Sequence, residues 1–294
     1  VKFTVTETEE IQTVEMRDAH NEIFISKTAI SGSEEIAGAT LQVISVDTNG
    51  LETIYKEWTT DGTGVTAIAA IPAGEYILRE LTAPNGYIVA EEIAFTVNVD
   101  GTLTSTASAD GKTVVMKDDV TKLTISKKDI TDSEELEGAV LTIRDEKGET
   151  VATWTSTKTP KYIEKIPVGK YTLTEETAPE GYVKAETISF EIKATGEMQT
   201  VSMVDDVTKV RISKTDITGT KELAGARLQV IIPGTQETIY EEWTSTNTPH
   251  MIEKLPVGEY ILRETTAPNG YLVAEDVKFT VTETEEIQTV EMRD

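Results

Sequence analysis

The chain has 294 residues, and its 27 Lys and Arg against 52 Asp and Glu give a formal net charge of −25 at pH 7. This length suits two or three domains of about 100 residues, and the acidic balance argues against nucleic acid as a partner, because phosphate groups require clustered Lys and Arg. Since the sequence contains no cysteine, a disulfide framework, a thiolate nucleophile and a thiolate metal site are excluded.

The first 18 residues, VKFTVTETEEIQTVEMRD, are identical to residues 277–294. They have a strand-like pattern and do not resemble a signal peptide, and no run of about 18 apolar residues predicts membrane insertion in this segment. We therefore expect a soluble piece of a longer protein, in which residues 1–18 are the orphan last strand of a preceding repeat. Alternatively, this strand pairs with the third domain of a neighbouring molecule by strand exchange.

The rest of the chain contains one pattern three times, and such repetition determines the fold. Each repeat has an early ISK strand, a central YxLxExxAPxGY segment and a closing VxMxD strand. These motifs start at Ile25, Tyr76 and Val114 in the first repeat, Ile125, Tyr171 and Val201 in the second, and Ile212, Tyr260 and Val290 in the third. We predict three domains, at residues 19–119, 120–206 and 207–294.

Each repeat consists of short segments of alternating polarity, rich in Val, Ile, Thr and Tyr and separated by Gly, Pro, Asn or Asp. This pattern predicts an all-β protein of three tandem β-sandwiches. The joints at 118–122 and 205–209, both DDVTK, contain no Gly/Ser or Pro-rich spacer and should be short and fairly stiff. Repeat 1 has an insertion within residues 99–113, most simply a longer hairpin.

Strand parity places three ionisable residues of each repeat on the core face. Because residues i, i+2 and i+4 of a strand share a face, Lys127 joins Leu123 and Ile125, and the central and closing strands end their apolar stripes in Glu and Asp. The resulting sets are Lys27, Glu80 and Asp118, then Lys127, Glu175 and Asp205, then Lys214, Glu264 and Asp294. The acidic neighbours Asp119, Glu176 and Asp206 fall on the outer face.

Burial of isolated charges would cost several kcal/mol each, so these groups should neutralise one another. Desolvation lowers the pKa of the Lys and raises the pKa of both carboxyls. A neutral amine is a nucleophile, and a protonated Glu can donate a hydrogen bond to the Asp carbonyl, so that loss of water would leave a Lys–Asp isopeptide bond. A buried ion-pair triad that forms no bond also explains the pattern.

The three motifs together resemble the CnaB-type (prealbumin-like, SpaA-type) domains of Gram-positive collagen adhesins and pilins, over essentially the whole chain. In that family a Lys and a last-strand Asp or Asn form a spontaneous isopeptide bond, with a Glu as catalytic proton shuttle. The resemblance implies Greek-key sandwiches whose first and last strands are adjacent. It also implies the bonds Lys27–Asp118, Lys127–Asp205 and Lys214–Asp294, with Glu80, Glu175 and Glu264 as the catalytic residues.

Repeat 1 departs from the others at Ala29, where they have an Asp that we expect to cap the following turn. We expect only a local loss of this cap.

Trp58, Trp154 and Trp243 occur once per repeat and should pack on the sheets. The two histidines, His20 and His250, have no fixed partner, and the acidic clusters lack the spacing of a calcium loop, so neither a metal nor a cofactor is expected.

The leading hypothesis is a structural protein, the stalk or shaft repeats of a Gram-positive cell-surface adhesin or fibre. It predicts an extracellular, cell-wall-attached place, with neighbouring repeats as partners. Alternatives are a module that binds a host extracellular-matrix protein and a fibre subunit assembled through residues 1–18. Turnover catalysis is not expected, because the only chemistry found acts once and on the chain itself.

Overall fold

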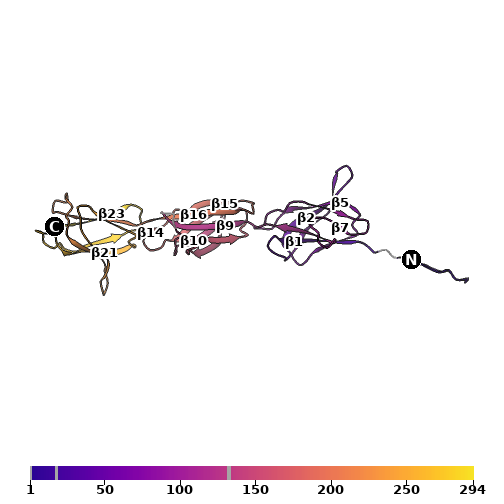
Figure 1. The fold of residues 1–294 in the computed structure, drawn as a ribbon, viewed down its shortest axis with the longest axis horizontal. Helices are drawn as coiled ribbons and strands as arrows, with labels where there is room; N and C mark the ends of the chain where they lie inside the picture. The colour runs from indigo at the N-terminus through magenta and orange to yellow at the C-terminus, as the bar shows by residue number, and fades with distance from the viewer. Residues whose placement is uncertain (1, 17–18, 131–133) are drawn as a thin grey trace. The chain divides into compact units, whose positions relative to one another are not determined.

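The computed structural model describes residues 2–16, 19–130 and 134–294. Within these ranges the regular elements are β-strands (Figure 1). The strands form six sheets. Each of the three predicted repeats contributes two of the sheets, which pack face to face around an apolar core. The predicted all-β fold of tandem sandwiches is therefore confirmed.

Domain 1 combines a sheet of order β4-β1-β8 with a sheet of order β3-β2-β5-β6-β7. Its strands are β1 (Glu22–Ala29), β2 (Ala37–Val46), β3 (Glu52–Asp61), β4 (Thr66–Ala69), β5 (Gly74–Thr82), β6 (Ile93–Val97), β7 (Leu103–Thr104) and β8 (Thr113–Asp118). The short strand β7 pairs with β6 and lies in the insertion of repeat 1, so the predicted longer hairpin is confirmed.

Domain 2 combines the orders β12-β9-β16-β14 and β11-β10-β13-β15. Its strands are β9 (Lys122–Asp129), β10 (Val140–Asp145), β11 (Thr150–Thr155), β12 (Lys161–Glu164), β13 (Gly169–Thr177), β14 (Tyr182–Val183), β15 (Ile188–Ile192) and β16 (Met198–Val207).

Domain 3 combines the orders β20-β17-β23 and β19-β18-β21-β22. Its strands are β17 (Lys209–Thr215), β18 (Arg227–Ile232), β19 (Thr238–Thr244), β20 (His250–Glu253), β21 (Gly258–Thr266), β22 (Val277–Val281) and β23 (Ile287–Arg293).

The alternation of apolar and polar residues explains why these segments form the two halves of a sandwich. In domain 1, Ile25, Leu41, Leu78 and Met116 come from β1, β2, β5 and β8 and are all buried in one core. The intervening residues of β5 are half-buried or exposed. Complete burial of such a side chain contributes about 1.5–3 kcal/mol, so the inward stripes hold the two sheets together.

The first and last strands of each domain lie side by side, as the family resemblance implied, and the structure shows that they run parallel. In domain 1, β1 pairs with β8 so that Lys27 is opposite Met116 and Ala29 is opposite Asp118. β9 pairs with β16 in the same way, as does β17 with β23. A Lys on the first strand is thereby one diagonal step from an Asp on the last.

The identical sequences at the two ends of the chain differ in structure. Residues 277–294 contain β22 and β23, whereas residues 2–16 are exposed and form no assigned strand. Residues 17 and 18 lie outside the described part of the chain. The assignment of residues 1–18 to a preceding repeat remains a prediction.

Two neighbouring residues of β16 test the inward and outward faces. Met203 is fully buried and Val204 is 43% exposed. We expect Met203→Ala to lower the free energy of unfolding of domain 2 by about 2–5 kcal/mol, because it leaves a cavity, and Val204→Ala to change it by less than about 1 kcal/mol. Denaturant titration of both variants measures this difference, and equal effects would contradict the assigned faces.

Candidate isopeptide-bond site

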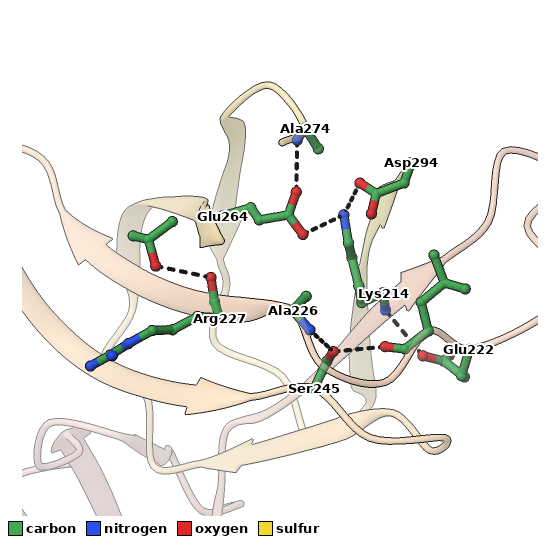
Figure 2. Close-up of polar contacts among 10 residues, drawn as sticks. Lys214, Glu222, Ala226, Arg227, Ser245, Glu264, Ala274 and Asp294 are labelled. Atoms are coloured by element: carbon green, nitrogen blue, oxygen red, sulfur yellow. Dashed lines mark hydrogen bonds and ion pairs between the residues drawn. The ribbon is translucent and has the colours of Figure 1, made fainter. Parts of the chain in front are cut away.

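Three strands of each sandwich bring one Lys, one Glu and one Asp together in the core. In domain 3, Lys214 comes from the first strand β17, Glu264 from β21 in the opposite sheet, and Asp294 directly follows the last strand β23 (Figure 2). Domains 1 and 2 repeat the arrangement. All nine predicted site residues are thus placed in three triads, one per domain, with the membership that strand parity predicted.

The amine of each triad contacts both carboxyl groups. Lys27 Nζ lies 3.0 Å from Glu80 Oε2 and donates a hydrogen bond to Asp118 Oδ1. The corresponding Lys–Glu distance is 3.1 Å in both other domains, and Lys127 and Lys214 also donate to their Asp partners. The Lys side chains are only 1–2% exposed and the carboxyls at most 1%, so the groups meet out of contact with water.

A β-bulge directly follows the Glu in each central strand. In domain 1, Leu41 is opposite Glu80 but Thr40 is opposite Thr82, so Leu81 is an extra residue. The same register shift follows Glu175 and Glu264. Because a bulge bends the strand and re-aims the neighbouring side chains, we attribute the orientation of the Glu in part to it.

Each Glu also accepts a hydrogen bond from a main-chain N–H. Glu80 Oε2 accepts the N–H of Ala90 at 2.7 Å. Ala185 and Ala274 donate in the same way to Glu175 and Glu264, at 2.8 and 2.7 Å. Sequence reasoning missed these donors, although an Ala that follows the Glu by ten residues in every repeat was a visible signal.

Burial raises the pKa of two of the acceptor carboxyls. Desolvation raises the pKa of Asp118 to about 7; the hydrogen bond and charge of Lys27 lower it, and the neighbouring Glu80 raises it. Burial also raises the pKa of Asp205 to about 7; Lys127 lowers this pKa and Glu175 raises it. An ionised triad has a net charge of −1, and uptake of one proton makes it neutral.

Each of these triads has two buried carboxyl oxygens without a hydrogen-bond donor, and a bound proton could supply one. Among the described residues, Glu80 Oε1 and Asp118 Oδ2 are buried and accept no hydrogen bond, as are Glu175 Oε1 and Asp205 Oδ2. A buried polar atom without a partner costs about 1–3 kcal/mol. A proton shared between the two carboxyls would supply a donor to one of them, and the acid–amine contact is then suited to condensation.

The acidic neighbours lie outside the triads, as predicted. Glu176 is exposed and pairs with Arg144 at 3.1 Å, and Asp206 pairs with Lys209 at 2.8 Å. The departure at Ala29 is local, because β1 still extends to this residue. In domain 3 the equivalent Asp216 accepts the main-chain N–H of Thr218 at 3.2 Å, which is the turn cap that we expected.

The aromatic residues have structural contacts. Trp58 and Trp243 are half-buried and pack against the cores of domains 1 and 3, which confirms the predicted packing for these two. His250 stacks on Trp243 with ring centroids 4.3 Å apart.

Across residues 2–16, 19–130 and 134–294, no group of three or more acidic or His side chains is arranged to hold a metal ion. In the same ranges, no helix has the length and apolar character needed to cross a bilayer.

Comparison with known proteins identifies the family. The profile of the SpaA prealbumin-like fold domain matches residues 21–112, 121–207 and 208–294. The chain therefore belongs to the SpaA family of prealbumin-like fold domains, as the three sequence motifs indicated. No curated protein sequence matches the chain.

Solved structures that are similar to this chain include the following three. The Bacillus anthracis TIE protein is 26% identical with a TM-score of 0.46, and the match covers 94% of this chain and 52% of that one. The chain thus spans about half the length of that relative. A streptococcal ancillary pilin is 17% identical in sequence with a TM-score of 0.39, and the match covers 93% of this chain and 98% of the pilin chain. The shaft pilin SpaA of Lactobacillus rhamnosus GG (17%, TM-score 0.33) is matched over 65% and 98%.

Removal of the lysine amine should raise the pKa of the buried Asp and make the stability of the domain depend on pH. In Lys127→Met, Asp205 loses the partner that lowers its pKa, so its folded-state pKa should exceed about 7, while the ordinary value is 3.8. The folded state then binds protons more tightly than the unfolded state, and stability should fall as pH rises from about 4 through 7 and beyond. Urea midpoints at pH 5 and pH 8 measure this trend.

The matched control is Lys147→Met, which removes the same charge from an exposed position. Its urea midpoint should lack the additional fall between pH 5 and pH 8. If the midpoint of Lys127→Met is constant or rises over this interval, the assigned shift of the Asp205 pKa is wrong.

Proposed function

We propose that this chain is a section of an extracellular stalk in which each domain closes itself with a Lys–Asp isopeptide bond. The observation that carries the proposal is the buried triad, present in every domain with the Lys on the first strand and the Asp at the end of the last. The bonds are Lys27–Asp118, Lys127–Asp205 and Lys214–Asp294. The glutamates, Glu80, Glu175 and Glu264, are the catalytic residues.

The reaction begins with a redistribution of protons. In the dry core the ionised pair and its neutral form, an amine and a carboxylic acid, become closer in free energy than they are in water. In domain 1, the Glu80 carboxyl contacts Lys27 Nζ at 3.0 Å and can accept or donate a proton there. The neutral amine of Lys27 is then the nucleophile and Cγ of Asp118 the electrophile.

The condensation balances without any external reagent. Nζ forms a bond to Cγ of the Asp, and a hydrogen bond from the protonated Glu stabilises the oxyanion of the tetrahedral intermediate. The Glu then transfers a proton from nitrogen to the departing hydroxyl, the C–O bond breaks, and water leaves. One amine and one carboxylic acid have become one amide and one water, and the Glu returns to its initial protonation state.

Burial favours this outcome in two ways. The groups are held in contact, and effective molarities of well-oriented groups reach about 10⁵–10⁸ M. The product is also a neutral amide, which removes the cost of keeping an amine and a carboxylate charged in the core. These effects together can drive a condensation that is unfavourable in dilute aqueous solution.

The position of the bond suits a protein under tension. Lys27 and Asp118 are 91 residues apart in sequence, on the first and last strands of domain 1. These two strands are adjacent and parallel. A pull on the chain would pass through the bond and bypass the intervening residues. Membership of the SpaA family, three near-identical repeats and joints without a spacer support a role as a spacer on the surface of a Gram-positive cell, attached to its wall.

The alternatives have less support. The insertion of repeat 1 pairs as β7 within its own sheet, which leaves little reason to assign it to a host-matrix ligand. Strand exchange through residues 1–18 would have to displace β22 and β23, which already contain the same sequence in domain 3. A bond at Asp294 would prevent that displacement.

The intact mass under denaturing conditions tests the bonds. The wild-type chain should lack three waters, about 18 Da each, and Glu80→Ala, Glu175→Ala and Glu264→Ala should each restore one, because each domain reacts independently. The control is Glu176→Ala, which changes the exposed neighbour of Glu175 and should keep the full deficit. An unmodified wild-type mass would leave only the ion-pair triads.

The response to force tests the stalk. When the full chain is stretched from its ends, the wild type should show no unfolding step, because each bond bypasses its domain. The triple variant Glu80→Ala, Glu175→Ala, Glu264→Ala should show three. For domain 2, the 78 residues between Lys127 and Asp205 correspond to roughly 250–280 Å of extended chain. Equal steps in the two proteins would contradict the proposed mechanical role.

A further inference from the structure

A second glutamate, distinct from the catalytic one, contacts the main chain of each reactive lysine. Glu35, Glu135 and Glu222 follow the lysine of their domain by eight residues. Each is half-buried and forms an isolated β-bridge with the residue after the lysine. We call this glutamate, with the apolar residue that follows it, the glutamate clamp.

In domain 1 the clamp holds both main-chain groups of Lys27. Glu35 Oε2 accepts the N–H of Lys27 at 2.7 Å, and Oε1 accepts the hydroxyl of Ser26 at 2.6 Å. The N–H of Ile36 donates to the carbonyl of Lys27 at 2.8 Å. The carboxylate therefore uses both oxygens on the segment that carries the nucleophile.

The other two domains have the same contacts. The Lys127 N–H lies 2.9 Å from Glu135, and the Lys214 N–H lies 3.1 Å from Glu222 (Figure 2). Ser126 and Ser213 donate their hydroxyls to these carboxylates, and Leu136 and Leu223 donate to the lysine carbonyls at 2.6 and 2.8 Å. A set of contacts that recurs three times with the same spacing has a role common to all three sites.

The clamp acts where the regular sheet ends. β4 pairs with β1 only as far as Ile25, whereas the parallel pairing with β8 continues to Ala29. In domain 3, β20 likewise stops at Ile212, two residues before Lys214. Beyond these points the clamp replaces the missing strand, and without it the buried lysine would have an unpaired N–H and carbonyl.

We propose that the clamp glutamate is a positioning residue for isopeptide bond formation, which rests on the function proposed above. It fixes the main chain of the lysine against the last strand, so that Nζ remains in contact with the Asp instead of sampling other positions. Reaction rates are sensitive to such placement, and a displacement of about 1 Å can cost 10²-fold. The clamp contacts the main chain of the lysine and transfers no proton. It acts by positioning, so its loss should lower the rate of isopeptide bond formation within the folded domain.

The test compares rates of bond formation in newly made full-length chains. Chains labelled briefly in cell-free translation are incubated, and the Lys27–Asp118 linked peptide is quantified over time by mass spectrometry after proteolysis. The folded fraction of domain 1 is measured in the same samples by pulse proteolysis. The variants are Glu35→Ala, Glu35→Gln and the control Glu34→Ala, which changes the exposed neighbour. Domains 2 and 3 of each molecule are internal standards.

We expect Glu35→Ala to slow bond formation per folded domain at least about tenfold, which corresponds to the loss of about 1.4 kcal/mol of positioning. Glu35→Gln should recover part of the rate, because its amide oxygen still accepts one hydrogen bond, and Glu34→Ala should react as the wild type does. A merely structural role would lower the folded fraction but leave the rate per folded domain unchanged, and that result would overturn the inference.

Two further outcomes are distinguishable. If Glu35→Ala prevents domain 1 from folding, Ser26→Ala, which removes only the hydroxyl that orients the carboxylate, should slow the reaction about two- to threefold, and an unchanged rate would overturn the inference. If the wild-type chain forms no bond, the proposed function is refuted and the clamp has no reaction to serve. Normal bonding in the wild type with an equal rate in Glu35→Ala refutes the clamp alone.

Discussion

An amine buried between two carboxyl groups is the interaction on which each domain depends. Charged groups in a dry core are costly, and removal of one partner typically costs about 3–5 kcal/mol because the others remain uncompensated. The sandwich can bury the triad only if its first, central and last strands bring the three groups into contact. The free-energy cost of burying these charges destabilises the fold. The same cost favours condensation, because the amide product removes two of the charges. Fold and chemistry therefore impose the same geometry on Lys27, Glu80 and Asp118.

Much of this could be predicted from the sequence because strand parity is a strong constraint. Lys127 shares its alternation with Leu123 and Ile125, and an alternation of this length fixes the face to which the side chain points. Parity also separated Glu175 from Glu176, since neighbouring residues in a strand face opposite ways. Because each motif occurs three times, each repeat supports the same prediction independently.

The sequence could not predict what depends on pairing between strands. The bulge at Leu81 arises from the register of β2 against β5, which no single strand encodes. The donor Ala90 acts through its main chain, so its side chain carries no chemical signal. The role of Glu35 depends on the point at which β4 stops pairing with β1, and the sequence of a single segment does not encode that point. In each case the spacing recurs in all three repeats, but only the fold shows what the spacing is for.

The most direct measurement of the central claim is a crystal structure of the full chain at a resolution that separates bonded from hydrogen-bonded atoms. The account predicts continuous density from Nζ of Lys27, Lys127 and Lys214 to Cγ of the partner Asp, with a planar amide and a C–N length of about 1.33 Å. Separate side chains with nitrogen and oxygen about 2.7–2.9 Å apart, as in an ordinary ion pair, would contradict it.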